Sequence, residues 1–315
     1  MRNSLSAKLS PKRLLPVVAA ACALLVLSAC GSNSLSTPSG TTSSAPATAS
    51  ASTPSPAPSG GASTTPTTPT TPTTPTTPTT PTAPPSTGGS DGSSALPTPP
   101  ANATVFSNIE ETTDNWADCS DCAGGAVTSD YWSAANQTTP SMDGASREFY
   151  VGGPAWADVL WYKRFGPLNS ASHFLWDFYI YFDTAGAANT WSAEYDVFQS
   201  INGQEFMMGS ECVFGDNIWH VWDSLHGQWV DIPVPCPRFA PNAWHHIQWY
   251  MDRPSSTTYH YDTLVVDGAA YTVDRTFTAN PIDWEDVIGV QWQLDVDGQG
   301  NPLHEWIDKA TFTVW

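Results

Sequence analysis

Apolar and polar residues alternate in short runs from about residue 146 onward, and almost no stretch there repeats with a helical period. Turn-forming residues separate these runs about every ten positions, which is the pattern of antiparallel strands. We predict ten strands: Arg147–Val151, Val159–Arg164, His173–Asp183, Thr190–Gln199, Glu205–Glu211, Ile218–Asp223, Trp244–Asp252, Thr258–Asp267, Val287–Asp297 and Trp306–Val314.

Several of these strands carry aromatic or aliphatic residues on one face only, and such a face must be buried against another layer. In Val287–Asp297 the other face is polar and holds Gln291, Gln293 and Asp295. Amide and carboxylate side chains in a row suit hydrogen bonding to hydroxyl groups. We therefore predict an all-β domain, a two-sheet antiparallel jelly-roll sandwich, with one polar sheet face.

The run Thr190–Gln199 is the most informative of the predicted strands. Its aromatic and β-branched residues favour extended backbone, and no Gly or Pro interrupts it. Because side chains alternate along a strand, Glu194 and Asp196 point to the same face. Two neighbouring carboxylates, in a chain with fifteen tryptophans, indicate a surface that handles sugars.

The tryptophans divide between core and surface by the same alternation. Trp176 and Trp292 fall on apolar faces and are expected in the core. Trp219 and Trp222 have opposite parity, so one of them faces outward. We take Trp222 as the candidate, because an exposed indole offers a flat apolar face to the C–H side of a sugar ring.

Residues 1–29 have the pattern of an export signal. Basic residues precede the apolar run Val17–Leu27, which is too short to span a bilayer as a stable helix. The segment Leu27–Cys30 looks like a bacterial lipobox, which implies cleavage before Cys30 and a lipid on its thiol; an ordinary cleaved signal peptide is the alternative. With Gly31 next, we expect a protein anchored to the cell envelope, at the outer membrane or cell surface.

Residues 30–100 consist almost entirely of Ser, Thr, Pro, Ala and Gly, with a three-residue Pro-Thr-Thr repeat. Without apolar side chains to bury, nothing offsets the conformational entropy of ordering this segment. We predict a lipid-anchored, disordered linker that acts as a semi-rigid tether. The β-sandwich domain then covers residues 101–315.

This domain is strongly acidic. It holds 29 of the 30 acidic and 7 of the 11 basic residues of the chain, a net charge of −22. Nucleic acid and anionic lipid surfaces are poor partners for it, whereas neutral polysaccharide and divalent cations are compatible with it. Solubility outside the cell is the simpler explanation of the same charge. We expect no nucleic-acid partner, and a monomer.

Four cysteines remain in the exported domain once the signal peptide is removed and Cys30 is lipidated. Disulfides are the default in an oxidising compartment, and four cysteines allow three pairings. We favour Cys119 with Cys122, which are close in sequence, and Cys212 with Cys236, which flank one strand-rich segment. A redox or zinc role for the C-x-x-C pair is the alternative.

Two segments resemble the concanavalin A-like lectin and glucanase superfamily, which includes laminin-G-like domains. They are Asn242–Tyr250 (NAWHHIQWY) and Tyr259–Gly268 (YHYDTLVVDG), the second of which ends in an Asp-Gly turn. The resemblance implies a jelly roll whose concave sheet carries a saccharide groove.

Within that superfamily the laminarinase-like β-glucanases carry an E-x-D-x-x-E motif. Glu194 matches their nucleophile and Asp196 the residue that assists it, but Gln199 replaces the general acid/base. An amide cannot donate a proton to a leaving group, and strict alternation places Gln199 on the face opposite Glu194. The motif therefore favours a groove without the chemistry, unless another acid substitutes; the candidates are Glu211, Asp177, Asp295 and Glu305.

Evidence for metal is weak. Asp295–Asn301 has alternating oxygen side chains and a glycine at the sixth position, as in a calcium loop, but Trp306 stands where the bidentate Glu would be. A hairpin turn is the favoured interpretation. His245 and His246 point to opposite faces of a predicted strand, which argues against a shared zinc. We predict no metal and no cofactor, with Ca²⁺ at this loop as the alternative.

These observations together predict a non-catalytic, surface-anchored polysaccharide-binding lipoprotein. The residues expected to contact the sugar are Glu194, Asp196, Gln199, Trp222, Gln291, Gln293 and Asp295. The first alternative is a glycoside hydrolase or polysaccharide lyase on the same fold that uses Glu194 and Asp196. The second is a structural or adhesive domain, in which both carboxylates merely face solvent.

Overall fold

The computed structural model describes residues 96–113 and 116–315. The predicted signal peptide, the lipidated Cys30 and the tether up to residue 95 lie outside the described residues. Within the described part of the chain, no helix is long and apolar enough to cross a membrane.

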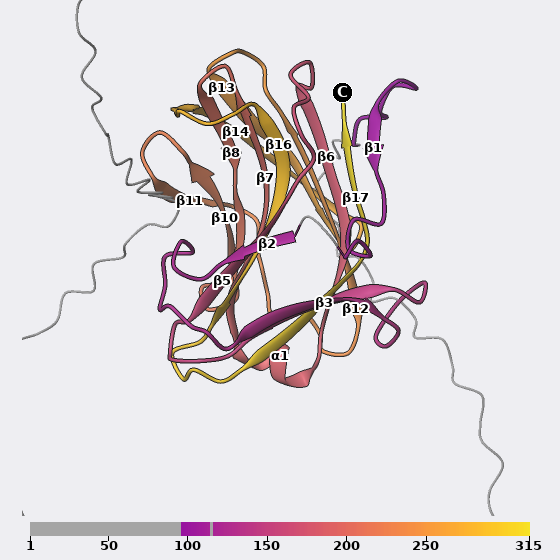
Figure 1. Ribbon diagram of the computed structural model, residues 1–315, viewed down its shortest axis with the longest axis vertical. Helices are drawn as coiled ribbons and strands as arrows, with labels where there is room; N and C mark the ends of the chain where they lie inside the picture. Colours follow the sequence, from indigo (N-terminus) through magenta and orange to yellow (C-terminus); the bar gives the residue numbers. More distant parts are fainter. Residues whose placement is uncertain (1–95, 114–115) are drawn as a thin grey trace, which may run out of the picture. The chain divides into compact units, whose positions relative to one another are not determined.

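Two antiparallel sheets form the domain (Figure 1). Sheet A has eight strands, in the order β14 (Ala269–Thr278), β13 (Thr258–Val266), β12 (Trp244–Asp252), β6 (His173–Phe182), β17 (Leu303–Val314), β4 (Ser146–Val151) and β3 (Tyr131–Gln137), with β1 (Thr104–Phe106) paired to β17. Sheet B has nine strands, in the order β11 (Gln228–Ile232), β10 (Ile218–Asp223), β9 (Ser210–Val213), β7 (Thr190–Ile201), β16 (Val287–Val296), β5 (Asp158–Arg164) and β2 (Trp116–Cys119), with β8 (Gln204–Met208) paired to β7 and to β15 (Asn280–Pro281).

This arrangement confirms the predicted all-β, two-sheet jelly-roll sandwich. All ten predicted strands are present, and Glu205–Glu211 is divided into β8 and β9. The Asp-Gly turn is also present, because Asp267 and Gly268 both have positive φ, 48° and 81°, and join β13 to β14 as a two-residue hairpin. The short helix α1 (Thr184–Asn189) begins where the Asp183 side chain accepts a hydrogen bond of 2.6 Å from the Gly186 N–H.

The core lies between the sheets and follows from the alternation of β6, in which every second residue is buried. Trp176 of β6 and Trp292 of β16 are fully buried, as predicted. Rings from both sheets interlock around Trp292, which stacks on Phe149 at 5.6 Å and meets Tyr195 edge-on at 4.5 Å. Such aromatic pairs stabilise a core beyond the area that they bury.

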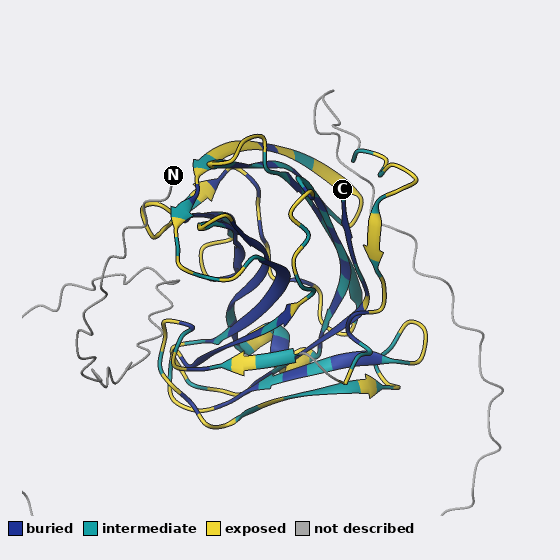
Figure 2. Cartoon of the chain, turned by 45° about the horizontal axis from the view of Figure 1, so that its top comes forward, coloured by how far each residue is buried: buried dark blue, intermediate teal, exposed yellow. Residues whose placement is uncertain are grey.

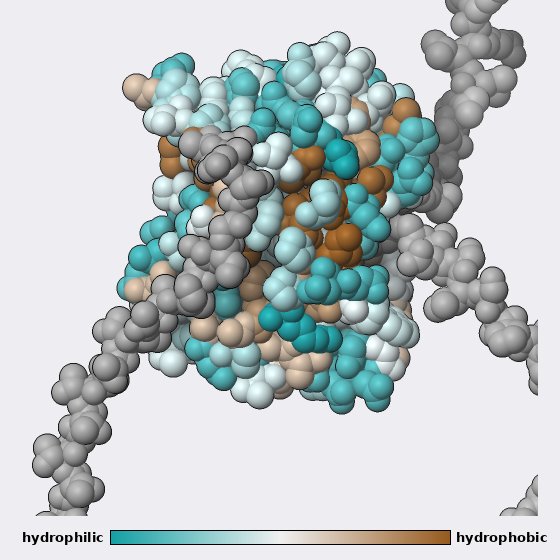
Figure 3. All heavy atoms as spheres, turned by 180° about the vertical axis from the view of Figure 1, so that it is seen from behind, coloured by the Kyte–Doolittle hydropathy of each residue, from teal (hydrophilic) through white to brown (hydrophobic). Residues whose placement is uncertain are grey.

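Burial is concentrated on the central strands, and exposed residues gather in the connecting loops and the outer strands (Figure 2). One side of the molecule shows apolar side chains gathered near its centre and hydrophilic ones around them (Figure 3). The structure also contains two disulfides, Cys119–Cys122 and Cys212–Cys236, the pairing that the sequence favoured.

Candidate functional site

The outward face of sheet B carries the polar residues that the sequence singled out. Glu194 and Asp196 lie on β7, and their partners across the strand pair are Gln293 and Gln291 of β16. Alternation sends the neighbouring Tyr195 into the core, so these four side chains form one block on the opposite face. Each is only 2–7% exposed, which makes the block the floor of a depression.

The depression, which we call the hollow, is shallow, and the space in it that is open to the centre of a water-sized sphere is about 20 Å³. Its lining combines the polar block with apolar and aromatic side chains: Leu160, Glu194, Asp196, Met207, Gly209, Trp222, Trp229, Gln291 and Gln293. The structure thus brings the predicted acid pair and the predicted amide row into one cavity.

Two tryptophans form the aromatic part of the lining. Trp222 of β10 is directly opposite Trp229 of β11, and their rings meet at 64° with centroids 5.0 Å apart. Gly209 is required beside them, because a Cβ there would lie 2.9 Å from the Trp222 Cβ and 3.3 Å from the Trp229 ring.

The expectation that Trp222 presents an exposed ring is wrong. Trp222 is only 4% exposed, because it packs on the hollow side of sheet B with Phe198, Met207 and Val287. Trp229 is the more accessible ring of the pair, and the sequence analysis missed it. The sequence signal that could have found it is the short turn between β10 and β11, which predicts a hairpin with Trp229 as a cross-strand partner.

Hydrogen bonds hold the polar floor in place. Gln293 Nε2 donates to Glu194 Oε1 at 2.6 Å and to Asp295 Oδ1 at 3.1 Å. The Ser210 N–H donates to Asp196 Oδ1 at 2.9 Å, and Ser192 Oγ donates to Asp295 Oδ2 at 2.5 Å. A ligand would therefore meet acceptors whose orientation is already set.

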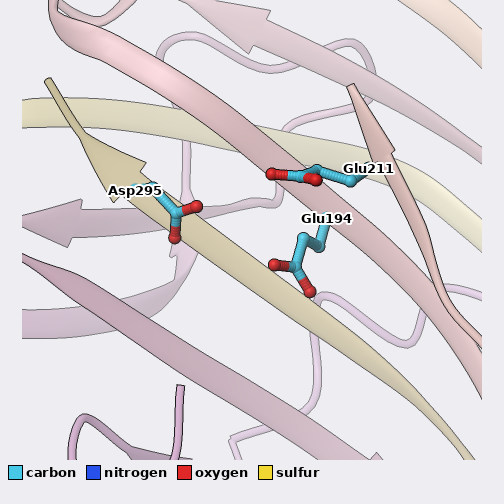
Figure 4. Close-up of side chains that lie close together, drawn as sticks. All are labelled: Glu194, Glu211 and Asp295. Carbon is cyan, nitrogen blue, oxygen red and sulfur yellow. The ribbon is translucent and has the colours of Figure 1, made fainter. Parts of the chain in front are cut away.

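Glu194 also has two acidic neighbours on other strands. Glu211 of β9 is its direct cross-strand partner, and oxygens of Glu194, Glu211 and Asp295 all lie within 4.8 Å of one another. Figure 4 shows the three carboxyl groups pointing toward one another from β7, β9 and β16. Two oxygens on opposite sides of a Ca²⁺ ion lie about 5 Å apart, so these three residues could hold a divalent cation.

Burial and mutual repulsion raise the pKa values of the acids on this face. The pKa of Glu194 lies well above its usual range because of burial first, and then because of the charges of Asp196 and Asp295. Burial raises the pKa of Asp196 to about 8 against the opposing hydrogen bond from Ser210. Burial and the Asp158 charge place the pKa of Asp295 well above its usual range. No Lys or Arg lines the hollow, so no positive charge offsets this upward shift of the pKa values.

Glu211 is linked to a histidine on β10, the neighbouring strand. His220 Nδ1 lies 3.2 Å from Glu211 Oε2, and His220 Nε2 lies 3.2 Å from Asp231 Oδ1. Burial lowers the pKa of His220, but the hydrogen bond and charge of Glu211 and the charge of Asp231 raise it further, so the net shift is upward.

Gln199 does not belong to this site, and including it among the sugar-contacting residues was wrong. It lies on the opposite face of β7, where Nε2 donates to the Leu168 and Ala171 carbonyls and Oε1 accepts from Arg253 Nε at 2.8 Å. The physical reason is the regular alternation of β7, since Gln199 and Glu194 are an odd number of positions apart.

The other predicted acids are separated from the hollow. Glu305 is fully buried between the sheets, where it accepts hydrogen bonds from Tyr195 and Trp292. Asp177 lies on sheet A, paired with His246 Nε2 at 2.7 Å, whereas His245 pairs with Asp267 at the same distance. His245 and His246 therefore have different carboxylate partners.

The Asp295–Asn301 segment is not a hairpin, because it joins β16 of sheet B to β17 of sheet A. It forms a local turn in which Asp297 Oδ1 accepts from the Gln299 N–H at 2.9 Å and the Asp297 carbonyl accepts from the Gly300 N–H at 3.1 Å. Asp295 instead directs its carboxyl group to Ser192 and Gln293. The oxygens suited to a cation are thus those around Glu194 and not those of the loop.

No family model matches the chain, and no curated protein matches it. Among solved structures, the chain is similar to an endo-β-1,4-glucuronan lyase from the fungus Trichoderma reesei, with 10% identity, a TM-score of 0.45, and coverage of 66% of this chain and 94% of that one. It is also similar to peanut lectin, with 11% identity, a TM-score of 0.40, and coverage of 68% and 99%. It is similar as well to the globular domain of T. cruzi calreticulin, with 12% identity, a TM-score of 0.40, and coverage of 67% of this chain and 88% of that one.

Proposed function

We propose that the hollow of sheet B binds a neutral polysaccharide. The observation that carries this proposal is the block of Glu194, Asp196, Gln291 and Gln293 in one cavity with Trp222 and Trp229. Carboxyl and amide groups satisfy sugar hydroxyls, and an indole ring covers the apolar C–H face of a pyranose. Sites for small ligands usually combine a few polar groups, which orient the ligand, with apolar and aromatic surface.

The charge of the site favours a neutral sugar over a uronate. A bound uronate would bring a carboxylate toward Glu194, Asp196 and Asp295, with no Lys or Arg in the lining to offset it. The same argument disfavours a polysaccharide lyase, since that reaction requires the substrate carboxylate to be neutralised. The net charge of −22 in residues 101–315 acts in the same direction at longer range.

Trp229→Ala is expected to weaken binding about tenfold, because it removes the accessible ring of the hollow. The probes are soluble neutral β-glucans, and the measurement is affinity electrophoresis of the full chain. Trp132→Ala is the matched control, because Trp132 is 41% exposed and lies on sheet A. If Trp229→Ala is retarded as strongly as the wild type, the sugar binds outside the hollow. The same conclusion follows if Trp229→Ala and Trp132→Ala lose binding equally.

Glycoside hydrolysis at the same hollow is the second candidate, favoured by the position of Glu211. A retaining glycosidase needs two carboxyls about 5 Å apart, and oxygens of Glu194 and Glu211 lie within 4.8 Å. Glu194, with its raised pKa, would hold the proton for the leaving group, and Glu211 would be the nucleophile.

Reducing ends released from neutral β-glucans distinguish the two candidates. Binding alone predicts no release above the background of the Glu194→Gln variant. Release by the wild type that disappears in both Glu194→Gln and Glu211→Gln establishes hydrolysis. Release that persists in both variants assigns the activity to other residues or to a contaminant.

We also propose that the domain is displayed from the cell envelope on a lipid anchor at Cys30. The support is the Leu27–Cys30 segment and the composition of residues 30–100, most of which lie outside the described residues. A tether of this kind would hold a sugar-binding domain away from the membrane that anchors it.

A further inference from the structure

A pair of tryptophans lies at one end of the strands that carry Glu194, Asp196 and Asp295, the three acids that we call the acid row. Trp191 is at the start of β7, and Trp156 is just before β5. Their rings meet edge-on, at 86° with centroids 5.2 Å apart. Trp156 is 48% exposed and Trp191 is half-buried. Neither ring is part of the core or of the hollow lining.

A β-bulge places Trp191 outside the regular alternation of β7. Ser192 faces Asp295 and Thr190 faces Val296, so Trp191 is the extra residue between two consecutive residues of β16. Bulges redirect side chains in this way, often next to functional sites. The Trp191 ring is partly accessible and contacts the exposed Trp156, and the next residue, Ser192, donates its hydroxyl to Asp295.

The backbone at Trp156 is held in a conformation that a bulky residue rarely adopts. Its φ is 63°, in the left-handed region, which is unfavourable for a residue other than glycine. Hydrogen bonds fix it there, since the Trp156 N–H donates to the Asp297 carbonyl and the Trp156 carbonyl accepts from the Ala126 N–H. A tryptophan kept in a position that suits glycine, with about half of the residue exposed to solvent, points to a role for the ring itself.

Two glycines leave room for this pair. A Cβ at Gly298 would lie 2.6 Å from Cζ2 of Trp156, and a Cβ at Gly215 would overlap the Trp191 ring. The corner formed by the two rings is therefore built by four separate local features: the bulge, the left-handed residue and two close glycine contacts.

We propose that Trp156 and Trp191 form a second sugar-binding subsite, which takes a further unit of the same neutral saccharide chain beyond the acid row. This inference rests on the proposed function of the hollow. From Asp196 to Trp191 the strand advances roughly 17 Å, so a chain that lies over Glu194 can contact Trp229 and this corner together. The crossed rings offer one apolar face and one edge to a pyranose.

The test compares neutral oligosaccharides of increasing length, from laminaribiose and cellobiose to their hexasaccharides, by titration calorimetry of the full chain. The wild type is expected to gain affinity with length. Trp156→Ala and Trp191→Ala should each lose about tenfold affinity for the longest probes and keep wild-type affinity for the shortest ones. The Trp132→Ala control should bind every probe as the wild type does.

Trp156→Gly separates binding from folding. Glycine relieves the left-handed backbone, so the melting temperature should stay at or above that of the wild type while affinity for long probes falls. Wild-type affinities of the Trp156 and Trp191 variants at every length would overturn the subsite and leave the hollow intact. A wild-type chain that binds no probe at any length would overturn the proposed function, and the subsite with it.

Discussion

Glu305→Gln is expected to be more stable than the wild type above pH 8, by several kcal/mol. Glu305 is completely buried between the sheets, with its oxygens 2.9 Å from the Tyr195 hydroxyl and 2.8 Å from Trp292 Nε1. Burial raises its pKa from 4.5 to about 8 against these two hydrogen bonds. Glutamine fits the same partners, because its carbonyl accepts from Trp292 and its amide donates to the Tyr195 oxygen.

The direction of the pH dependence follows from the two pKa values of Glu305. The unfolded carboxyl releases its proton near pH 4.5, whereas the folded one keeps it to about pH 8. Between these values the unfolded state binds fewer protons, so the free energy of unfolding falls as pH rises and is constant outside the window. The shift corresponds to at most about 5 kcal/mol for this group.

Urea unfolding at pH 5 and pH 9 measures the effect. The wild type should lose stability between the two pH values, and Glu305→Gln should lose less than the wild type, by at most about 5 kcal/mol. Glu110 and Asp196, whose pKa values burial also raises to about 8, contribute in the same direction, as do Glu194 and Asp295, so both proteins remain pH-dependent. Glu285→Gln is the control, because Glu285 is 79% exposed. Equal pH dependence in the wild type and Glu305→Gln would show that this carboxyl is ionised in the folded protein at pH 5.

Trp292→Ala is expected to cost about 3–5 kcal/mol of stability. The indole is fully buried and contacts the rings of Phe149, Phe178 and Tyr195. Truncation to alanine leaves a cavity between the sheets and removes the hydrogen bond to Glu305 Oε2. Trp292 contacts side chains of both sheets. Its neighbours on β16, Gln291 and Gln293, point to the opposite face and line the hollow.

Equilibrium urea unfolding of Trp292→Ala, Trp292→Phe and Trp132→Ala checks the prediction. Phenylalanine refills most of the cavity, so its cost should be intermediate. Trp132→Ala should cost clearly less, about 1 kcal/mol, because this partly exposed ring loses only its surface contacts with Tyr150 and His304. A Trp292→Ala variant no less stable than Trp132→Ala would contradict the placement of this ring in the core.

The sequence predicted the strands whose residues alternate between buried and exposed. It missed β14, a mostly exposed edge strand of ten residues in which only Val273 is buried, with Tyr271 and Phe277 packed against the core. It also missed β3 and β11, which have seven and five residues. The strands β1, β2 and β15, also missed, have two to four residues each and carry too little pattern to recognise. The interruption between β8 and β9 is tertiary in origin, since the Ser210 N–H turns to the Asp196 carboxyl group.

The candidate site was partly predictable, because its residues follow the alternation of side chains along two strands. Alternation within one strand places Glu194 beside Asp196, and Gln291 beside Gln293. Which strands are neighbours depends on the order within the sheet, so the contact of Glu194 with Glu211 could not be inferred from spacing. The strain at Trp156 and the bulge at Trp191 likewise arise from tertiary contacts, and no local motif predicts them.

The most direct test of sugar binding at the hollow is a crystal structure with a bound neutral oligosaccharide. We predict ring density against Trp229, with hydroxyl groups within hydrogen-bond distance of Glu194, Gln291 or Gln293. An oligosaccharide bound on the outward face of sheet A would contradict the assignment of the hollow as the binding site. So would an oligosaccharide bound in the cavity beside Trp315, at the C-terminal end of β17.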